Sequence, residues 1–386
     1  MKSILFYISR YPGYGGIEKV TTILANYWSK ELGWKIQILS VKSQEKSPLP
    51  LLDKNVKVVF LPKPNEIKSD ENIGLVKKMI SKEKVDWIIY QDSYVPTQGL
   101  LHEIKGMCNL AICEHNMPDC ISVQDYFTWK TKKIGSFMDF VHKFTYFRHR
   151  ILINKWERER RRELYSICDK YILLSEKYIN VFKHITKLDN YDKLAWINNP
   201  ATGEAMNTQK KVFKKNMIFI GRLDSQKGVM LLLSIWKEIE KKHPDWTLTI
   251  VGDGPLKKNM EKYIKIHNLS RVMMKGYQQN INKYLDESSI LLMTSIFEGW
   301  PLVLFEAMGR GTVPVAFDSF KTASEIIDNN KDGILIPPFN EKLYISKLEE
   351  LICDKNTICA YSSRALLKVR KHQVAVLLQK WNNCLE

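Results

Sequence analysis

The sequence predicts an α/β protein made of two Rossmann-like, doubly wound domains. The chain has 386 residues, more than one hydrophobic core usually serves. Apolar, β-rich runs alternate with segments of helical periodicity, a pattern typical of a parallel sheet covered by helices on both faces. A polar, turn-rich stretch near residue 200 divides these runs into two series, and each series indicates one domain.

The first series predicts an N-terminal domain at residues 1–198. Its expected strands are 3–9, 35–41, 56–61, 85–90, 109–113 and 170–174. Segments of helical periodicity, for example 18–32, lie between several of them. Residues 199–210 are polar and rich in turn-forming residues, so we expect them to be the linker.

The second series predicts a C-terminal domain at residues 211–360. Its expected strands are 217–221, 247–251, 272–275, 290–293, 312–316 and 333–336. Two such domains are expected to face one another across a cleft. Ligands of doubly wound folds bind beyond the carboxyl ends of the strands, so the functional loops are expected there.

Composition favours a cytoplasmic protein. The chain holds no apolar run of about 18 residues that would span a bilayer. Its first residues lack the apolar length and the cleavage site of a secretory signal, and they are typical of a buried strand. Seven cysteines without a CxxC pair predict neither a disulfide framework nor a zinc site, and we expect reduced thiols.

The formal net charge of +17 is concentrated at residues 130–162. The basic residues there are Lys130, Lys132, Lys133, Lys143, Arg148, Arg150, Lys155, Arg158, Arg160, Arg161 and Arg162. Aromatic and aliphatic residues are interleaved with them. This mixture suits a helix lying on an anionic membrane surface, and it also suits a solvated helix whose apolar stripe is core, the commoner case. The chain has no RNP motif, helix-turn-helix pattern or zinc finger, so nucleic acid is not an expected partner.

Two glycine-containing loops each join a predicted strand to a helix. In the loop 11–18, Gly15 and Gly16 would let backbone amides approach an anionic ligand, although a plain tight turn also explains them. In the loop 221–228, Arg222 and Lys227 are five residues apart and can converge on one anionic group. Such cations would stabilise a pyrophosphate leaving group.

A third segment, residues 297–306, follows the predicted strand 290–293 and leads into a helix. Glu298 and Glu306 lie at its two ends, with Gly299 and Pro301 between them. Carboxylates accept hydrogen bonds from sugar and ribose hydroxyls, and the first amides of a helix can bind phosphate. A helix cap would account for Glu298 alone, but it does not account for the whole segment.

These segments together resemble the family 4 glycosyltransferases of GT-B fold. The resemblance rests on Glu-x7-Glu at 298–306, Gly-Arg-Leu-Asp-x-x-Lys-Gly at 221–228, Val-Gly-Asp-Gly-Pro at 251–255 and Gly-Gly-Ile-Glu at 15–18. They occur in the family's order, and the similarity covers essentially the whole chain. It implies a retaining glycosyltransferase that uses a nucleotide sugar, with UDP as the expected nucleotide.

The resemblance implies a role for each matching residue. Arg222 and Lys227 would hold the donor diphosphate, Glu298 the donor sugar and Glu306 the donor ribose. The histidine that this family places near the reacting sugar corresponds to His115. The remaining donor-binding positions would be the backbone at Gly15, Gly16, Gly299, Pro301, Leu302 and Val303, and a base pocket containing Gly252, Asp253, Gly254 and residues 277–281.

The same resemblance implies how the C-terminal segment packs and which class of acceptor the protein uses. Residues 361–386 would form a helix that packs back on the N-terminal domain. The acceptor would be a lipid-linked saccharide or a polysaccharide of the cell surface, such as capsule or lipopolysaccharide, reached by a peripheral protein on the inner face of the cell membrane. No Asp-x-Asp motif occurs, so no metal or other cofactor is expected. Two alternatives remain open: a sugar-nucleotide epimerase or phosphorylase of the same fold, and a non-catalytic, membrane-associated protein that binds nucleotide sugars.

Overall fold

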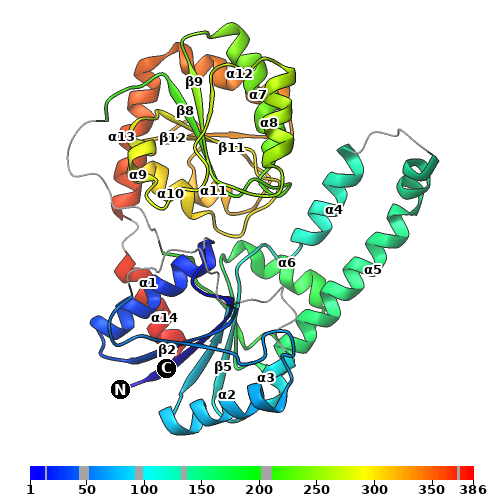
Figure 1. Ribbon diagram of the computed structural model, residues 1–386, viewed down its shortest axis with the longest axis vertical. Coiled ribbons are helices and arrows are strands. Elements are labelled where there is room, and N and C mark those ends of the chain that lie inside the picture. Colours follow the sequence, from blue (N-terminus) through cyan, green and yellow to red (C-terminus); the bar gives the residue numbers. More distant parts are fainter. Residues whose placement is uncertain (14, 43–51, 92–98, 132–136, 201–210, 372–373) are drawn as a thin grey trace. The chain divides into compact units, whose positions relative to one another are not determined.

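The computed structural model describes residues 1–13, 15–42, 52–91, 99–131, 137–200, 211–371 and 374–386. These residues divide into two compact units (Figure 1). Unit 1 comprises Met1–Ser122, Ser136–Pro200 and Ala375–Glu386, and unit 2 comprises Val123–Gly135 and Ala201–Val374. The predicted linker, 199–210, lies mostly outside the described residues.

Unit 1 is built on a seven-stranded sheet in the order β3-β2-β1-β4-β5-β6-β7, with every neighbouring pair parallel. Its strands are β1 (Ser3–Arg10), β2 (Lys35–Lys42), β3 (Lys57–Phe60), β4 (Trp87–Tyr90), β5 (Asn109–Glu114), β6 (Lys170–Leu173) and β7 (Leu194–Trp196). The six predicted strands are all present within a few residues of their expected bounds. The sequence analysis missed β7, because this three-residue edge strand is only half-buried and has no apolar run.

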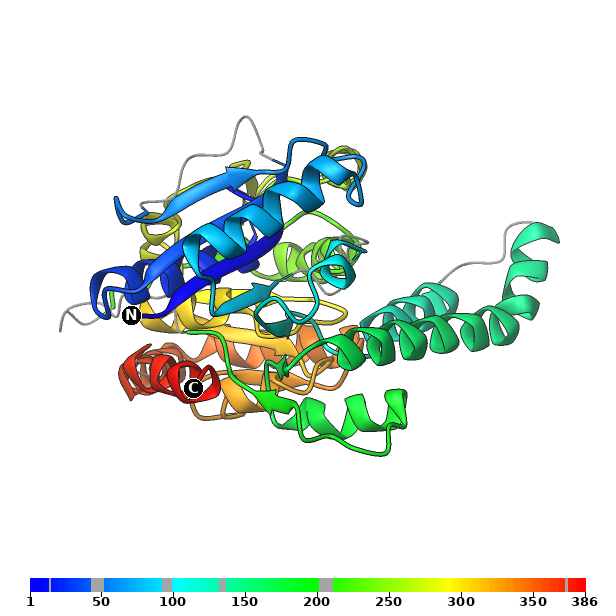
Figure 2. The same ribbon diagram turned by 90° about the horizontal axis from the view of Figure 1, so that it is seen from below.

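The helices of unit 1 are α1 (Gly16–Lys30), α2 (Asp70–Glu83), α3 (Gly99–Glu103), the start of α4 (Cys120–Thr131), α5 (Phe137–Ile167), α6 (Lys177–Thr186) and α14 (Val374–Cys384). Helix α1 packs on the sheet through Trp28, whose ring stacks on Phe6 with centroids 5.6 Å apart. Helix α5 has 31 residues, and its first half extends beyond the sheet of unit 1 (Figure 2).

Helix α14 joins unit 1 from the far end of the sequence. The rings of Trp381 and Trp28 meet edge to face at 5.9 Å, and Trp28 Nε1 donates to Asn382 Oδ1 at 3.1 Å. The preceding helix, α13 (Lys355–Lys371), belongs to unit 2, where the Ser362 hydroxyl donates to the Gly311 carbonyl at 2.7 Å. The segment that returns to unit 1 therefore starts at 375, later than the predicted 361.

Unit 2 contains a six-stranded sheet in the order β10-β9-β8-β11-β12-β13, again parallel throughout. Its strands are β8 (Asn216–Ile220), β9 (Thr247–Val251), β10 (Val272–Met274), β11 (Ile290–Met293), β12 (Val313–Phe317) and β13 (Ile334–Ile336). Its other helices are α7 (Val229–Lys242), α8 (Lys257–Ile266), α9 (Asn282–Asp286), α10 (Leu302–Gly309), α11 (Ala323–Ile326) and α12 (Glu341–Cys353). All six predicted strands are present.

Both sheets reverse their strand order beside their first strand. In unit 1 the chain runs outward from β1 to β3 and resumes at β4 on the other side of β1. In unit 2 it runs outward from β8 to β10 and resumes at β11 on the other side of β8. In such sheets, ligands usually bind beyond the carboxyl ends of the strands at the point where the order reverses. In unit 2, buried side chains such as Phe219, Trp236 and Leu292 form one core on which these loops rest.

Candidate active site

The loop after β8 is folded around Asp224. Its carboxylate accepts hydrogen bonds from the Arg222 guanidinium and, at 3.1 Å, from the backbone N–H of Lys227. A short polar side chain that bonds a backbone amide three residues later stabilises a tight turn. Asp224 thereby fixes the path of the loop between the two predicted diphosphate ligands. The sequence analysis gave Asp224 no role, although this turn pattern was visible.

Glycines bring the loops after β8, β9 and β11 into close contact. A Cβ on Gly252 would lie 1.9 Å from the Gly221 carbonyl oxygen, and one on Gly228 would lie 2.1 Å from that of Thr294. Gly228 also has φ 62°, which other residues rarely adopt. Backbone hydrogen bonds join the same loops, among them Ile296 N–H to the Gln226 carbonyl at 2.7 Å.

Lys227 and Glu298 meet although 71 positions separate them. Lys227 Nζ lies 2.6 Å from Glu298 Oε1, and the two side chains are 20% and 8% exposed. Arg222, by contrast, is 64% exposed beside Asp224 and can move toward a ligand. A partly buried cation next to a buried carboxylate can bind phosphate oxygens with one group and hydroxyls with the other.

The segment 297–306 continues from this ion pair into α10. The Gly299 carbonyl accepts a hydrogen bond from the Thr322 hydroxyl at 2.9 Å, and Pro301 is the N-cap of α10. Leu302 and Val303 thus occupy the first turn, where helix amides point outward at the positive end of the helix dipole. Glu306 is buried one turn further on.

The loop after β9 carries the predicted base-pocket residues. Asp253 is exposed, and its carboxylate accepts from Gly254 N–H at 2.7 Å and pairs with Lys257 Nζ at 3.2 Å. Gly254 itself packs against Leu223, since a Cβ there would lie 2.5 Å from the Leu223 carbonyl oxygen. Asp253 thus stands on the rim of the same group of loops as Lys227.

The predicted site residues of unit 1 lie at the carboxyl ends of β1 and β5. Gly15 is the N-cap of α1 and Gly16 its first residue, as expected for a loop that presents a helix N-terminus. His115 directly follows β5, and its Nε2 is hydrogen-bonded to Gln91 Oε1. Burial lowers the pKa of His115 to about 4, so the imidazole is neutral at pH 7.

The predicted residues therefore form two groups, one in each unit. Arg222, Lys227, Glu298, Glu306, Asp253 and their neighbours gather in unit 2, whereas Gly15, Gly16 and His115 belong to unit 1. Gln91 was missed, because a single glutamine after a strand carries no sequence signal for function.

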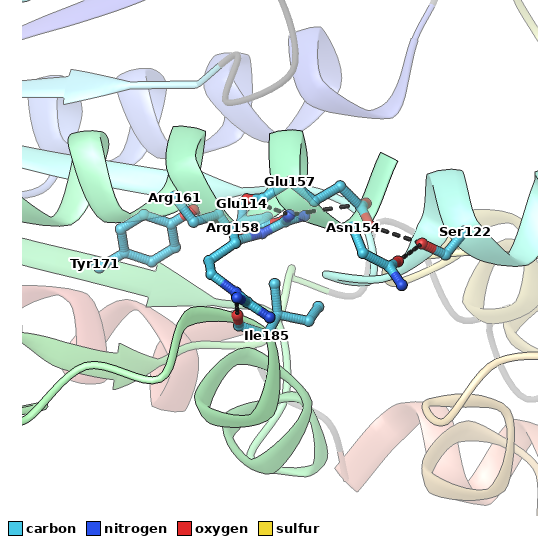
Figure 3. A network of polar contacts seen from close by, with 8 residues as sticks. All are labelled: Glu114, Ser122, Asn154, Glu157, Arg158, Arg161, Tyr171 and Ile185. Carbon is cyan, nitrogen blue, oxygen red and sulfur yellow. Dashed lines mark hydrogen bonds and ion pairs between the residues drawn. The ribbon is translucent and has the colours of Figure 1, made fainter. Parts of the chain in front are cut away.

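The basic segment 130–162 falls largely on α5, and part of it is buried. Arg161 is fully buried, and its guanidinium donates to both carboxylate oxygens of Glu114, with the shortest contact at 2.6 Å (Figure 3). Tyr171 donates to the same carboxylate at 2.7 Å, and Glu157 in turn accepts from Ser122 at 2.8 Å. Burial raises the pKa of Glu157. This network attaches α5 to β5 and to the start of α4.

Nearer the start of α5, three large apolar side chains face solvent. Ile151, Leu152 and Trp156 are 67%, 65% and 47% exposed. The interpretation that the apolar residues of this helix are core is therefore wrong for these three. The side chains at 129–140, 142–144 and 147 lie outside the described residues. None of the described helices has the length and apolar character needed to cross a membrane.

Comparison with known proteins places this chain among glycosyltransferases. Residues 204–366 match the family "Glycosyl transferases group 1". A protein of Haemophilus influenzae named as an uncharacterized glycosyltransferase is 25% identical over 390 residues, covering 100% of both chains. The amylovoran biosynthesis glycosyltransferase AmsD of Erwinia amylovora is 29% identical over 57% of this chain and 63% of that protein.

Solved structures show the same fold. A mutant of the S. aureus protein TarM, in complex with fondaparinux, alpha-GlcNAc-glycerol and UDP, gives a TM-score of 0.76 at 15% identity, with 100% of both chains covered. Anabaena HepE in complex with UDP gives 0.69 at 15% identity, with 99% of both chains covered. These structures show that the chain has the GT-B fold. The group 1 domain at residues 204–366 and the relatives named as glycosyltransferases support a transferase enzyme.

Proposed function

We propose that this glycosyltransferase transfers a sugar, with retention of anomeric configuration, from a nucleoside-diphosphate donor to a growing cell-surface glycan. The observation that carries the proposal is the Lys227–Glu298 ion pair at 2.6 Å beside the first turn of α10. It joins a cation for the diphosphate to a carboxylate for the sugar. UDP is the proposed nucleotide, since TarM and HepE were crystallised with it.

In the proposed reaction the bond between the sugar C1 and the diphosphate oxygen breaks while an acceptor hydroxyl attacks C1 from the same face. The acceptor proton passes to the departing phosphate oxygen, so the products are the glycoside and the nucleoside diphosphate. Negative charge grows on the diphosphate as the bond breaks, and Arg222 and Lys227 stabilise it. The reaction requires no metal, and we expect turnover to persist in EDTA.

Replacement of Lys227 tests this assignment. Lys227→Ala should lower kcat by about 10²–10³-fold, the usual cost of one group that stabilises the developing charge. Lys242→Ala is the matched control, because Lys242 is an exposed lysine at the opposite end of α7. Release of UDP from a panel of UDP-sugars measures turnover, and a Lys227→Ala protein as active as the control would rule the mechanism out.

A thermal-shift screen against nucleotide sugars would identify the donor, because a bound donor stabilises the folded state. Incubation of the labelled donor without an acceptor separates transfer from the alternatives. Epimerisation of the sugar under these conditions would indicate an epimerase, and binding without turnover when an acceptor is added would indicate a binding protein.

The proposed acceptor is a lipid-linked or polysaccharide glycan, reached at an anionic membrane surface on the inner face of the cell membrane. Two relatives support this class by name: AmsD, and a Campylobacter jejuni enzyme that extends a saccharide on diphospho-undecaprenol. The exposed part of α5 offers a surface for the lipid. Ile151, Leu152 and Trp156 stand there beside exposed Arg148, Arg150 and Lys155. Apolar residues that enter the headgroup region, flanked by cations, fit anionic lipid.

Flotation with liposomes tests the membrane surface. The wild type should float with vesicles that contain anionic lipid and not with neutral ones, and the double variant Leu152→Ser/Trp156→Ser should float far less. Ile266→Ser is the matched control, because Ile266 in α8 is also exposed, at 62%. Equal flotation of the double variant and the control would show that α5 is not the surface that binds.

A further inference from the structure

Glu157 connects two helices of unit 1. Its side chain is 1% exposed, and it reaches from α5 to Ser122 in the first turn of α4 (Figure 3). Glu157 Oε2 lies 2.8 Å from the Ser122 hydroxyl. Ser122 is also the last residue of unit 1 before Val123–Gly135, a segment that belongs to unit 2. The contact therefore fixes the point at which the chain leaves unit 1.

The surroundings of Glu157 disfavour its charged form. Arg161 Nη1 is 3.7 Å from Glu157 Oε1, beyond hydrogen-bond range, and the guanidinium is bonded to Glu114 through Nε and Nη2. Asp119, in the turn before α4, and Glu114 add negative charge. Burial raises the pKa of Glu157, and these two carboxylates raise it further, whereas Arg161 and the bond to Ser122 lower it. The balance favours the neutral acid.

The hydroxyl of Ser122 gives an independent indication of the proton. It lies 2.8 Å from Asn154 Oδ1 and 2.8 Å from Glu157 Oε2. A hydroxyl has one hydrogen, so it can donate to only one of these two oxygens. If Glu157 is ionised, the other contact brings two acceptors together. If Glu157 carries a proton, its O–H donates to Ser122, Ser122 donates to Asn154, and both contacts are hydrogen bonds.

We propose that Glu157 is a proton-dependent latch between α5 and α4: as the neutral acid it donates to Ser122, and Ser122 in turn donates to Asn154. When the proton passes to water, the Glu157 carboxylate takes the Ser122 hydrogen, and the bond from Ser122 to Asn154 is lost. Two hydrogen bonds thus hold the start of α4 at low pH, and one holds it at high pH. The latch lies within unit 1 and does not depend on the proposed sugar transfer.

The direction of the pH effect follows from the chemistry of the acid. The folded protein binds this proton more tightly than the unfolded chain does, because folding raises the pKa of Glu157 above its ordinary value of 4.5. The contribution of the latch to stability is therefore complete below pH 4.5 and is lost as the pH rises through the raised pKa. An ordinary ion pair of a glutamate behaves in the opposite way, since it needs the charged carboxylate.

Carboxyl ¹³C NMR on the full chain measures the protonation state. With glutamate labelled at the side-chain carboxyl carbon, the Glu157 signal is the one missing from Glu157→Gln. Glu159 is the matched reference, because it is 65% exposed on the same helix, and Glu159→Gln identifies its signal. We expect Glu157 to remain neutral at pH values at which Glu159 is already ionised. If Glu157 ionises at the same pH as Glu159 or at a lower one, the proposal is wrong, and the Asn154 amide must instead turn its Nδ2 toward Ser122.

Hydrogen exchange tests whether the proton also holds α4. The amides of residues 124–128 bond back to carbonyls in the first turn of that helix, so their protection reports how firmly the turn is held. Relative to the amides of α2, their protection should be about tenfold higher below the NMR midpoint of Glu157 than above it, the value of about one hydrogen bond.

Two variants separate the latch from a general effect of pH. Glu157→Gln cannot lose the proton, so its protection should stay high on both sides of the midpoint. Asn154→Ala, at an exposed position, removes the second acceptor and should show the lower protection at both. Protection of α4 that does not change with pH in the wild type, or that changes equally in Glu157→Gln, would refute the latch.

Discussion

Removal of the Arg161 side chain should lower the stability of unit 1 more than replacement of an exposed charged residue does. Arg161 and Glu114 are both fully buried, and the guanidinium donates to the carboxylate through Nε and Nη2. Arg161→Met keeps most of the side-chain volume but leaves the Glu114 carboxylate buried with Tyr171 as its remaining donor in the network of Figure 3.

The expected cost follows from what the carboxylate loses. Breaking a buried ion pair by deleting one partner typically costs about 3–5 kcal/mol, most of it the penalty of an uncompensated buried charge. The double variant Arg161→Met/Glu114→Gln removes that charge while its amide oxygen still accepts from Tyr171. It should therefore recover about 1–3 kcal/mol relative to Arg161→Met alone.

Urea unfolding of the full chain measures these changes, with hydrogen exchange of the β5 and β6 amides to assign the loss to unit 1. Lys347→Met is the matched control, because Lys347 forms an exposed pair with Glu350 at 2.7 Å, and such pairs contribute at most about 1 kcal/mol. The reasoning fails if Arg161→Met costs no more than this control, or if the double variant is less stable than the single one.

Three further outcomes are expected. Gly228→Ala should lower the stability by about 2 kcal/mol more than Gly33→Ala in thermal unfolding, because both residues have φ 62° but only Gly228 would place its Cβ against a backbone carbonyl, at 2.1 Å; equal losses would contradict the close packing of these loops. Glu298→Gln should strengthen binding of UDP alone by about tenfold in calorimetry, since Lys227 loses its competing carboxylate, while sugar transfer falls; unchanged UDP affinity would argue against the exchange of partners. Burial lowers the pKa of His115 from 6.5 to about 4, so the unfolded chain takes up a proton first as the pH falls, and stability decreases between pH 6.5 and 4 by about 3 kcal/mol; His115→Gln should lack this component in urea unfolding at pH 7 and 4.5, and an identical pH dependence in both proteins would exclude it.

The sequence predicts the strands of this fold well because both sheets are buried on two faces. Such strands appear as short, nearly continuous apolar runs, and twelve of them were located on that basis. β7 escaped because it is an edge strand with a half-buried pattern. The return to unit 1 at 375 was placed too early, because α13 and α14 are consecutive helices and the sequence alone does not indicate which unit each one packs against.

The site is predictable where a chemical role depends on residue type and loop position. Arg222, Lys227 and Glu298 follow strands at the edge where ligands bind, so their grouping could be inferred before any side chain was placed. The ion pair between Lys227 and Glu298 could not be inferred from the sequence, because it joins positions 71 apart through specific rotamers. Gln91 was invisible for the same reason, since its significance comes only from the ring nitrogen that it contacts. The exposure of Ile151, Leu152 and Trp156 could not be predicted either, because it depends on how far α5 extends past the sheet of unit 1.

The contact between α14 and the first helix and strand has a consequence for how the protein is made. Unit 1 takes its last helix from residues that leave the ribosome only after all of unit 2, and Lys2 Nζ donates to the Leu385 carbonyl at 3.1 Å. The seven-stranded sheet is synthesised early, but α14 cannot cover the surface around Trp28 until translation has passed residue 374. We therefore expect nascent chains halted before that point to bind chaperones through this face, although unit 2 is by then almost complete. Any fusion or truncation near residue 380 would alter the packing at the start of the chain.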